Sequence, residues 1–152
     1  WLESPLDQPL PVLTVEDLEL ARIEAGIPEW GVDMTLKTMP PEMGGLFEAA
    51  HVSYRKGCYV GQEVLMRIYS RGHTNRTWTG LRLDGPAEAG AVVESTDRPD
   101  AGVVTSSVQS PEFGWIATAM VRNEASAPGT QVVVRTERGE LLGEVVSLPF
   151  RR

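Results

Sequence analysis

Cysteine is nearly absent from this chain of 152 residues, since Cys58 is the only one. A single cysteine excludes an internal disulfide framework and favours a reducing compartment. Long apolar runs are missing too, so we expect no transmembrane helix. Residues 1–7 contain no starting Met, basic leader or small-residue cleavage site, which argues against a secretory signal and indicates the interior of a longer chain. These absences together favour a cytoplasmic protein without a membrane partner.

Several motifs of common enzyme classes are also missing. The sequence contains no serine-hydrolase, P-loop or Rossmann fingerprint. The spacing of His51, Cys58 and His73 matches no zinc motif, so we expect no metal site, although convergence of the three in space stays an open alternative. Catalytic Cys–His pairs are assembled by the fold rather than by short spacing, so we interpret His51 as a strand or surface histidine.

The net charge of −7 argues against general nucleic-acid binding, which relies on a basic face. The charge is nevertheless unevenly placed. Residues 55–82 contain six basic residues and one acidic residue, whereas residues 1–54 contain two basic and ten acidic ones and residues 83–152 contain six and ten. The basic segment is either a local anion site or a solvated basic face, and the charge pattern alone does not decide between them.

The first part of the chain predicts two helices joined by turn-rich segments. Residues 1–13 are rich in Pro and Leu without periodicity, so we expect an extended lead-in. Thr14 is a suitable N-cap for a helix over about 15–25, which Gly26 ends and Pro28 prevents from continuing. Residues 46–52 form either a short strand or a turn of helix, and a second helix is expected over about 61–70.

From Asn75 onward the pattern changes to short β-rich runs separated by Gly, Pro and Asp. These runs lie at residues 77–83, 91–93, 102–108, 114–121, 131–135 and 141–146. Six short strands in about seventy-five residues predict a small antiparallel barrel, with residues 137–140 as its last hairpin turn. We interpret Trp78 as part of the barrel core. The fold class expected is therefore α+β.

The chemistry is expected at residues 56–63, the octapeptide K-G-C-Y-V-G-Q-E. A thiol is a useful nucleophile or soft ligand only as thiolate, which a neighbouring cation or helix N-terminus favours. Arg55 and Lys56 precede Cys58, and the predicted helix begins just after Gly61. The alternative is that Cys58 is a small buried hydrophobic residue.

The octapeptide resembles the K-G-C-Y-x-G-Q-E signature of the YgfZ-type folate-binding proteins, relatives of the aminomethyltransferase T-protein of the glycine cleavage system. Residues 22–33 resemble a second segment, R-x-E-A-G-x-P-x-x-G-x-D, which lines the folate cavity in T-protein relatives. This resemblance implies that Arg22 pairs with a ligand carboxylate and that Glu24 accepts hydrogen bonds from a pterin. The alternative is a surface Arg–Glu pair, although residues two apart on a helix do not face each other.

The resemblance also implies an architecture and a ligand. Residues 1–74 would be the C-terminal part of a T-protein-like folate-binding core, and residues 75–150 a complete C-terminal barrel. The expected cofactor is tetrahydrofolate or a derivative. Lys56, Tyr59, Gln62 and Glu63 of the signature would bind it, with Tyr59 stacking on the pterin.

Three functions follow as alternatives. The first, implied by YgfZ, is a folate-binding accessory factor that supports assembly or repair of iron–sulfur enzymes, with Cys58 as a redox-active thiol or transient ligand. The second, implied by T-protein, is folate-dependent one-carbon transfer, and the third is a non-catalytic interaction barrel. We favour the first, because the T-protein route needs no cysteine. Clusters usually take four ligands, so the role of Cys58 would be shared with glutathione, a second chain or a client.

Overall fold

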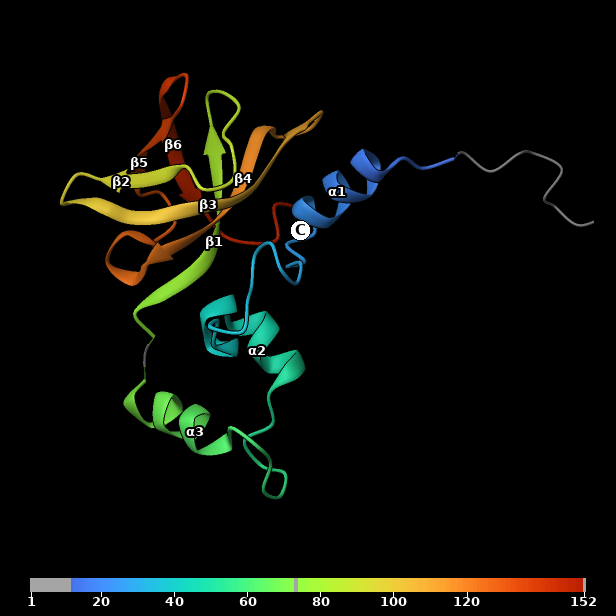
Figure 1. Cartoon of the computed structure of the whole chain (residues 1–152), viewed down its shortest axis with the longest axis vertical. Helices are drawn as coiled ribbons and strands as arrows, with labels where there is room; N and C mark the ends of the chain where they lie inside the picture. The colour runs from blue at the N-terminus through green and yellow to red at the C-terminus, as the bar shows by residue number, and fades with distance from the viewer. Residues whose placement is uncertain (1–11, 73, 152) are drawn as a thin grey trace, which may run out of the picture.

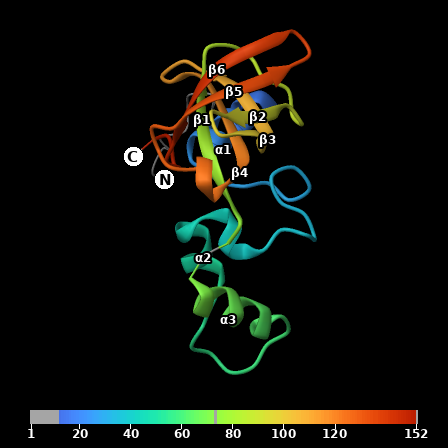
Figure 2. The ribbon, with the colours of Figure 1, turned by 90° about the vertical axis from the view of Figure 1, so that its left-hand side faces the viewer.

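The computed structural model describes residues 12–72 and 74–151, and it consists of a barrel with helices from the first half of the chain at one side (Figure 1). The helices are α1 (Val15–Glu24), α2 (Gly45–His51) and α3 (Gln62–Arg71). A 3₁₀ turn, η1 (Pro40–Met43), precedes α2, and a second one, η2 (Asn123–Ala125), lies in the second half of the chain. A second view agrees that α2 lies just beyond one end of the barrel and α3 lies farther out (Figure 2). Of the lead-in predicted for residues 1–13, residues 1–11 lie outside the described residues.

The second half of the chain forms a closed six-stranded barrel, as predicted. Its strands are β1 (Arg76–Leu83), β2 (Val92–Ser95), β3 (Arg98–Ser110), β4 (Gly114–Arg122), β5 (Gln131–Thr136) and β6 (Gly139–Val146). All neighbouring strands are antiparallel, in the order β1-β4-β3-β2-β5-β6, and β1 closes the barrel by pairing with β6. Thr136 pairs with Gly139 across the predicted last hairpin turn. The α+β fold class is therefore confirmed.

The barrel interior is filled by small and branched side chains from every strand. Leu81, Val93, Val104, Val134 and Val145 are fully or almost fully buried there. Buried residues lie two positions apart along β5 and β6, as expected for strands with one face toward the barrel interior. A smaller core of Ile23, Ile116 and Phe150 joins α1 to the outside of the barrel.

Strand β3 is longer than predicted and contains an irregularity. It begins at Arg98 rather than at residue 102, and its register against β4 shifts between Val104 and Ser106. A bulge of this kind adds one residue to a strand and re-aims the side chains beside it. The sequence pattern alone gave no sign of this bulge, which lies at Thr105.

The predicted helices are confirmed and the undecided segment is resolved. Thr14 caps α1, and its hydroxyl accepts a hydrogen bond from the Asp17 backbone N–H while the Asp17 carboxylate accepts one from the Thr14 backbone. The segment over residues 46–52 is helical, because it forms most of α2. Gly61 caps α3 with a φ of +86°, a conformation that favours glycine. None of the helices in the described part of the chain is long and apolar enough to cross a membrane.

Candidate functional site

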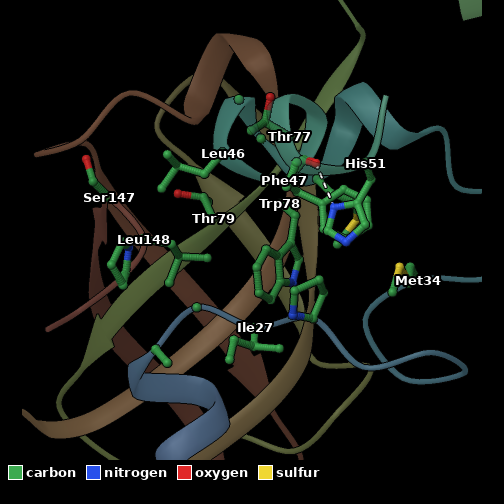
Figure 3. A pocket seen from close by; sticks show the side chains of 18 of the residues that line it. Ile27, Met34, Leu46, Phe47, His51, Thr77, Trp78, Thr79, Ser147 and Leu148 are labelled. Atoms are coloured by element: carbon green, nitrogen blue, oxygen red, sulfur yellow. Dashed lines mark hydrogen bonds between the residues drawn. The ribbon is translucent and has the colours of Figure 1, made fainter. Parts of the chain in front are cut away.

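An apolar pocket of about 630 Å³ opens between α2 and the outside of the barrel (Figure 3). Its walls come from the turn after α1, from α2, from β1 and from the segment after β6. The residues used below are Ala25–Pro28, Phe47, Ala50, His51, Trp78 and Leu148. Among the described residues that line it, none is acidic, and His51 is the one with a titratable side chain. A pocket of this volume and lining suits a flat, largely uncharged group.

Aromatic rings supply much of the pocket surface. The His51 ring stacks on the Phe47 ring with centroids 4.1 Å apart, and its Nδ1 lies 2.8 Å from the Phe47 carbonyl oxygen. Trp78 is only 4% exposed, and its indole N–H donates to the Thr105 hydroxyl at 3.4 Å. Trp78 is therefore buried as expected, but it lies outside the cluster of side chains that fills the barrel and it lines the pocket instead. His51 is an exposed helical residue, and the strand alternative is wrong.

Arg22 and Glu24 both contact the barrel, and the pocket lining starts one residue later, at Ala25. The Glu24 carboxylate accepts a hydrogen bond from the Ser110 hydroxyl at 2.7 Å and forms an ion pair with Arg151 at 2.9 Å. The Arg22 guanidinium donates to the Asp33 carboxylate at 2.5 Å. Hydrogen bonding to Glu19 and the negative charge of Asp33 raise the pKa of Arg22, which therefore stays charged.

The signature octapeptide forms the end of the loop between α2 and α3 and the first turn of α3. Cys58 is exposed on this loop. The Lys56 ammonium lies 4.7 Å from the centroid of the Tyr59 ring, a cation–π contact beside the thiol. Gln62 and Glu63 begin α3, where Glu63 forms an ion pair with Arg67 at 2.9 Å. Among the predicted residues of the octapeptide, Lys56 and Tyr59 are thus in contact, whereas Glu63 pairs with Arg67 along α3.

The predicted site residues form two groups that lie apart, namely Arg22 and Glu24 on α1 and the octapeptide that contains Cys58. Figures 1 and 2 both place α3 beyond α2, on the side away from α1, which carries Arg22 and Glu24. The helix α2 connects the two regions, because its residues line the pocket and its C-terminal end leads into the loop of Cys58. His73 lies outside the described residues, and within those residues no group of three His, Cys, Asp or Glu side chains is placed to hold a metal ion.

A tyrosine cluster around this loop was not anticipated. All three tyrosines of the chain, Tyr54, Tyr59 and Tyr69, lie at the loop or on α3. The Tyr54 hydroxyl donates to the Glu48 carboxylate of α2, and burial together with this hydrogen bond raises the pKa of Tyr54. The Tyr59 hydroxyl is buried without a hydrogen-bond partner among the described residues. Most buried polar groups in proteins have such a partner, so Tyr59 is unusual in this respect.

The comparison with known families decides what kind of barrel this is. Residues 76–151, half of the chain, match the family model described as the glycine cleavage T-protein C-terminal barrel domain. The chain belongs to this family. The T-protein barrel domain therefore accounts for all six strands and for the segment after β6 that reaches the pocket.

Individual relatives extend the similarity beyond the T-protein barrel domain. An aminomethyltransferase of Staphylococcus haemolyticus is 32% identical over 128 residues, which cover 82% of this chain and 34% of that protein. The mitochondrial iron–sulfur cluster assembly factor IBA57 homolog of Chaetomium globosum is 38% identical over 87 residues, covering 56% of this chain and 20% of that protein. The chain thus spans about a third of the first relative and a fifth of the second.

A solved structure shows the same fold. The crystal structure of the glycine cleavage system aminomethyltransferase T from Bartonella henselae superimposes with a TM-score of 0.77 and 27% sequence identity. The match covers 88% of this chain and 38% of that protein, so it includes part of the helical segment that precedes the T-protein barrel domain. These comparisons support a T-protein-type architecture, and they include relatives of two different functions.

Proposed function

We propose that this protein binds a folate-type molecule and supports the assembly or repair of iron–sulfur enzymes through Cys58. It would act as a cytoplasmic accessory factor rather than as a turnover enzyme. The observation that carries the proposal is the exposure of Cys58 on the loop between α2 and α3, at the centre of the K-G-C-Y-V-G-Q-E sequence. The similarity to the IBA57 homolog, whose name describes iron–sulfur cluster assembly, supports it.

An exposed thiol suits transient chemistry with a second molecule. A buried structural cysteine is chemically inert, whereas an accessible one beside a cation can react or bind a soft metal. In this proposal Lys56, two residues before Cys58, supplies the cation, and its ammonium lies over the ring of Tyr59, the residue after Cys58. One thiolate is insufficient for a cluster that takes four ligands, so the remaining ligands would come from a client, a second chain or glutathione. The iron–sulfur cluster is in this view a cargo or substrate.

The apolar pocket is the proposed site for the flat end of the folate. Its volume lies within the range of small-molecule sites, and Trp78, Phe47 and His51 offer aromatic surface for stacking. The signature loop carries the Tyr59 hydroxyl, which is buried without a hydrogen-bond partner among the described residues. In this proposal Lys56, Tyr59, Gln62 and Glu63 contact the ligand or client beside Cys58.

A second candidate is folate-dependent aminomethyl transfer, and the similarity to the Staphylococcus haemolyticus aminomethyltransferase over 82% of this chain favours it. The two functions differ in their need for a thiol. One-carbon transfer to folate requires no cysteine, so replacing Cys58 would leave it unchanged. The same replacement would abolish the function that we propose.

Two measurements test the proposal. Titration of the protein with 5-formyltetrahydrofolate by calorimetry tests the folate site, and absence of binding would remove both folate functions. In cells that lack their own YgfZ-type factor, Cys58→Ser should fail to restore the activity of an iron–sulfur enzyme while the purified variant keeps its thermal unfolding midpoint.

A matched control relocates the thiol. Thr96 lies in the turn between β2 and β3 and is exposed, so Thr96→Cys added to Cys58→Ser presents a thiol elsewhere on the same protein. We expect this double variant to remain inactive. Restoration by the relocated thiol would show that a cysteine at any exposed position suffices, and full activity of Cys58→Ser would overturn the assigned role.

A further inference from the structure

We infer that Arg22 and Asp33 are positioning residues that hold the pocket wall at Ala25–Pro28 against the barrel, and that neither contacts the ligand. This inference deepens the proposed function and rests on it in one respect, namely that the pocket is the ligand site. It changes the role that the sequence resemblance implies for Arg22, from carboxylate binding to the support of a wall.

Arg22 has no N–H group left for a ligand within the described contacts. A guanidinium has five N–H donors in a fixed fork. Here Nε and Nη2 donate to the two oxygens of Glu19 at 2.8 and 2.5 Å, and Nη2 also donates to the Ser106 hydroxyl at 3.0 Å. Nη1 donates to the Ile27 carbonyl at 2.9 Å and to Asp33 at 2.5 Å. All five donors are therefore engaged inside the chain.

Asp33 is the buried centre of this arrangement, since its side chain is 0% exposed. Its Oδ2 accepts from Arg22 and from the Glu29 backbone N–H at 2.9 Å. Its Oδ1 accepts from three barrel hydroxyls: Thr105 at 2.5 Å, Ser106 at 3.1 Å and Thr118 at 2.9 Å. A buried carboxylate without partners is very unfavourable, so this set of donors fixes where Asp33 lies.

The barrel itself is shaped to receive Asp33. Adjacent residues of a regular strand point to opposite faces, yet Thr105 and Ser106 both donate to the same Asp33 oxygen. The register shift of β3 between Val104 and Ser106 makes this possible. The bulge and the buried carboxylate thus form one unit that ties the segment before the barrel to β3 and β4.

The pocket wall, Ala25–Pro28, lies in the sequence between Arg22 and Asp33. Arg22 precedes the wall in sequence, Asp33 follows it, and the Arg22 guanidinium donates a hydrogen bond to the Asp33 carboxylate. Arg22 also donates a hydrogen bond to the carbonyl oxygen of Ile27, which lies within the wall. Gly26 packs closely on the segment after β6, where an added Cβ would meet Leu148 Cβ at 3.1 Å. Loosening the pair would therefore move one wall of the pocket without removing a ligand contact.

The experiment compares Arg22→Gln, Arg22→Lys and Asp33→Asn with wild type. Arg98→Gln is the matched control, because it removes a half-buried arginine that pairs with Asp100 and Glu124 away from the pocket wall. Hydrogen exchange should accelerate about tenfold or more over residues 23–33 in all three variants, with protection of β4 unchanged. The control should not change exchange over residues 23–33. Unchanged exchange there in Arg22→Gln and Asp33→Asn would overturn the inference, whether or not folate binds.

A pair of ligands separates positioning from direct contact. If Arg22 positions the wall, Arg22→Gln lowers the affinity for 5-formyltetrahydrofolate and for a reduced pterin without the glutamate tail by the same factor. A loss confined to the folate, with affinity kept by Arg22→Lys, would show a carboxylate contact and overturn the inference. Wild-type protein that binds neither ligand would remove the proposed folate site, and the exchange result would still decide whether Arg22 and Asp33 hold the segment.

Discussion

The ring of Tyr54 stacks on the ring of Tyr69, with centroids 4.4 Å apart and planes inclined by 28°. Tyr54 lies in the loop of Cys58 and Tyr69 lies on α3, which follows that loop. The hydroxyl of Tyr54 also donates to Glu48 on α2, so one side chain ties the loop to both flanking helices. The loop is thereby held in place while Cys58 stays exposed.

Replacing Tyr69 by Ala should loosen the loop of Cys58. The change removes the stacked ring, and aromatic pairs contribute about 0.5–1.5 kcal/mol beyond their buried area. We expect faster hydrogen exchange over residues 53–60 and a drop in the free energy of unfolding of about 1 kcal/mol. Tyr69→Phe is the control, since it keeps the ring. Equal exchange in the Ala and Phe variants would show that the stack does not hold the loop.

Acid should weaken the ion pair and the hydrogen bonds that the Asp33 carboxylate forms with Arg22 and the barrel. Burial raises the pKa of this carboxyl, but hydrogen bonds from Thr105 and the Glu29 N–H and the charge of Arg22 outweigh it, so the pKa lies below its ordinary value of 3.8. A lowered pKa in the folded state gives stability that is present above pH 3.8 and is lost as the pH falls through the folded pKa.

Chemical unfolding of wild type and Asp33→Asn between pH 6 and pH 3 tests this linkage. The variant should be less stable near neutral pH and should lose less stability on acidification, so the difference between the two proteins narrows toward low pH. Asp97→Asn, an exposed carboxylate in the turn before β3, is the control and should follow wild type. If the difference in unfolding free energy between wild type and Asp33→Asn stays constant with pH, Asp33 does not have a lowered pKa in the folded protein.

Gly102 permits the close approach of β3 to β4. A Cβ at this position would lie 2.6 Å from the Met120 carbonyl oxygen, a backbone atom that cannot move aside. Gly102→Ala should lower the unfolding free energy by about 1–3 kcal/mol, measured by urea titration. Gly57→Ala serves as the comparison, because a Cβ there meets nothing within 4 Å. Similar losses for both variants would mean that steric contact with β4 is not the cause.

Local signals in the sequence were sufficient for most elements of the fold, although they left residues 46–52 undecided between a strand and a helix. The capping pair of Thr14 and Asp17 lies within one helical turn, so the start of α1 is readable from neighbouring residues. The same holds for the strands, because the β-rich runs and the Gly, Pro and Asp residues between them are local features of the sequence. The octapeptide likewise predicted a loop at Cys58 followed by a helix, and α3 begins at Gln62.

Contacts between distant parts of the chain were not predictable in this way. The pocket is lined by Leu148 together with Phe47 and Trp78, which are distant from it in the sequence. No local sequence pattern indicates that these residues line one pocket. The three barrel hydroxyls that donate to Asp33 come from positions more than seventy residues away, and two of them lie at a bulge that single-sequence periodicity does not reveal. Arg22 was therefore selected as a site residue from the motif, while the partners that occupy its donors were not foreseen.

Filling the pocket should separate ligand binding from folding. Ala50 and Ala49 are adjacent on α2 and both are exposed, but Ala50 lines the pocket and Ala49 is outside the set of lining residues. Ala50→Trp should place an indole in the space proposed for the pterin, so calorimetry should show affinity for 5-formyltetrahydrofolate reduced about tenfold or more, equivalent to about 1.4 kcal/mol. Ala49→Trp makes the same chemical change one position away and should bind as wild type does. Because both variants add the same residue to one helix, an equal loss in the two would place the ligand outside this pocket, whereas a loss confined to Ala50→Trp would identify the pocket as its site.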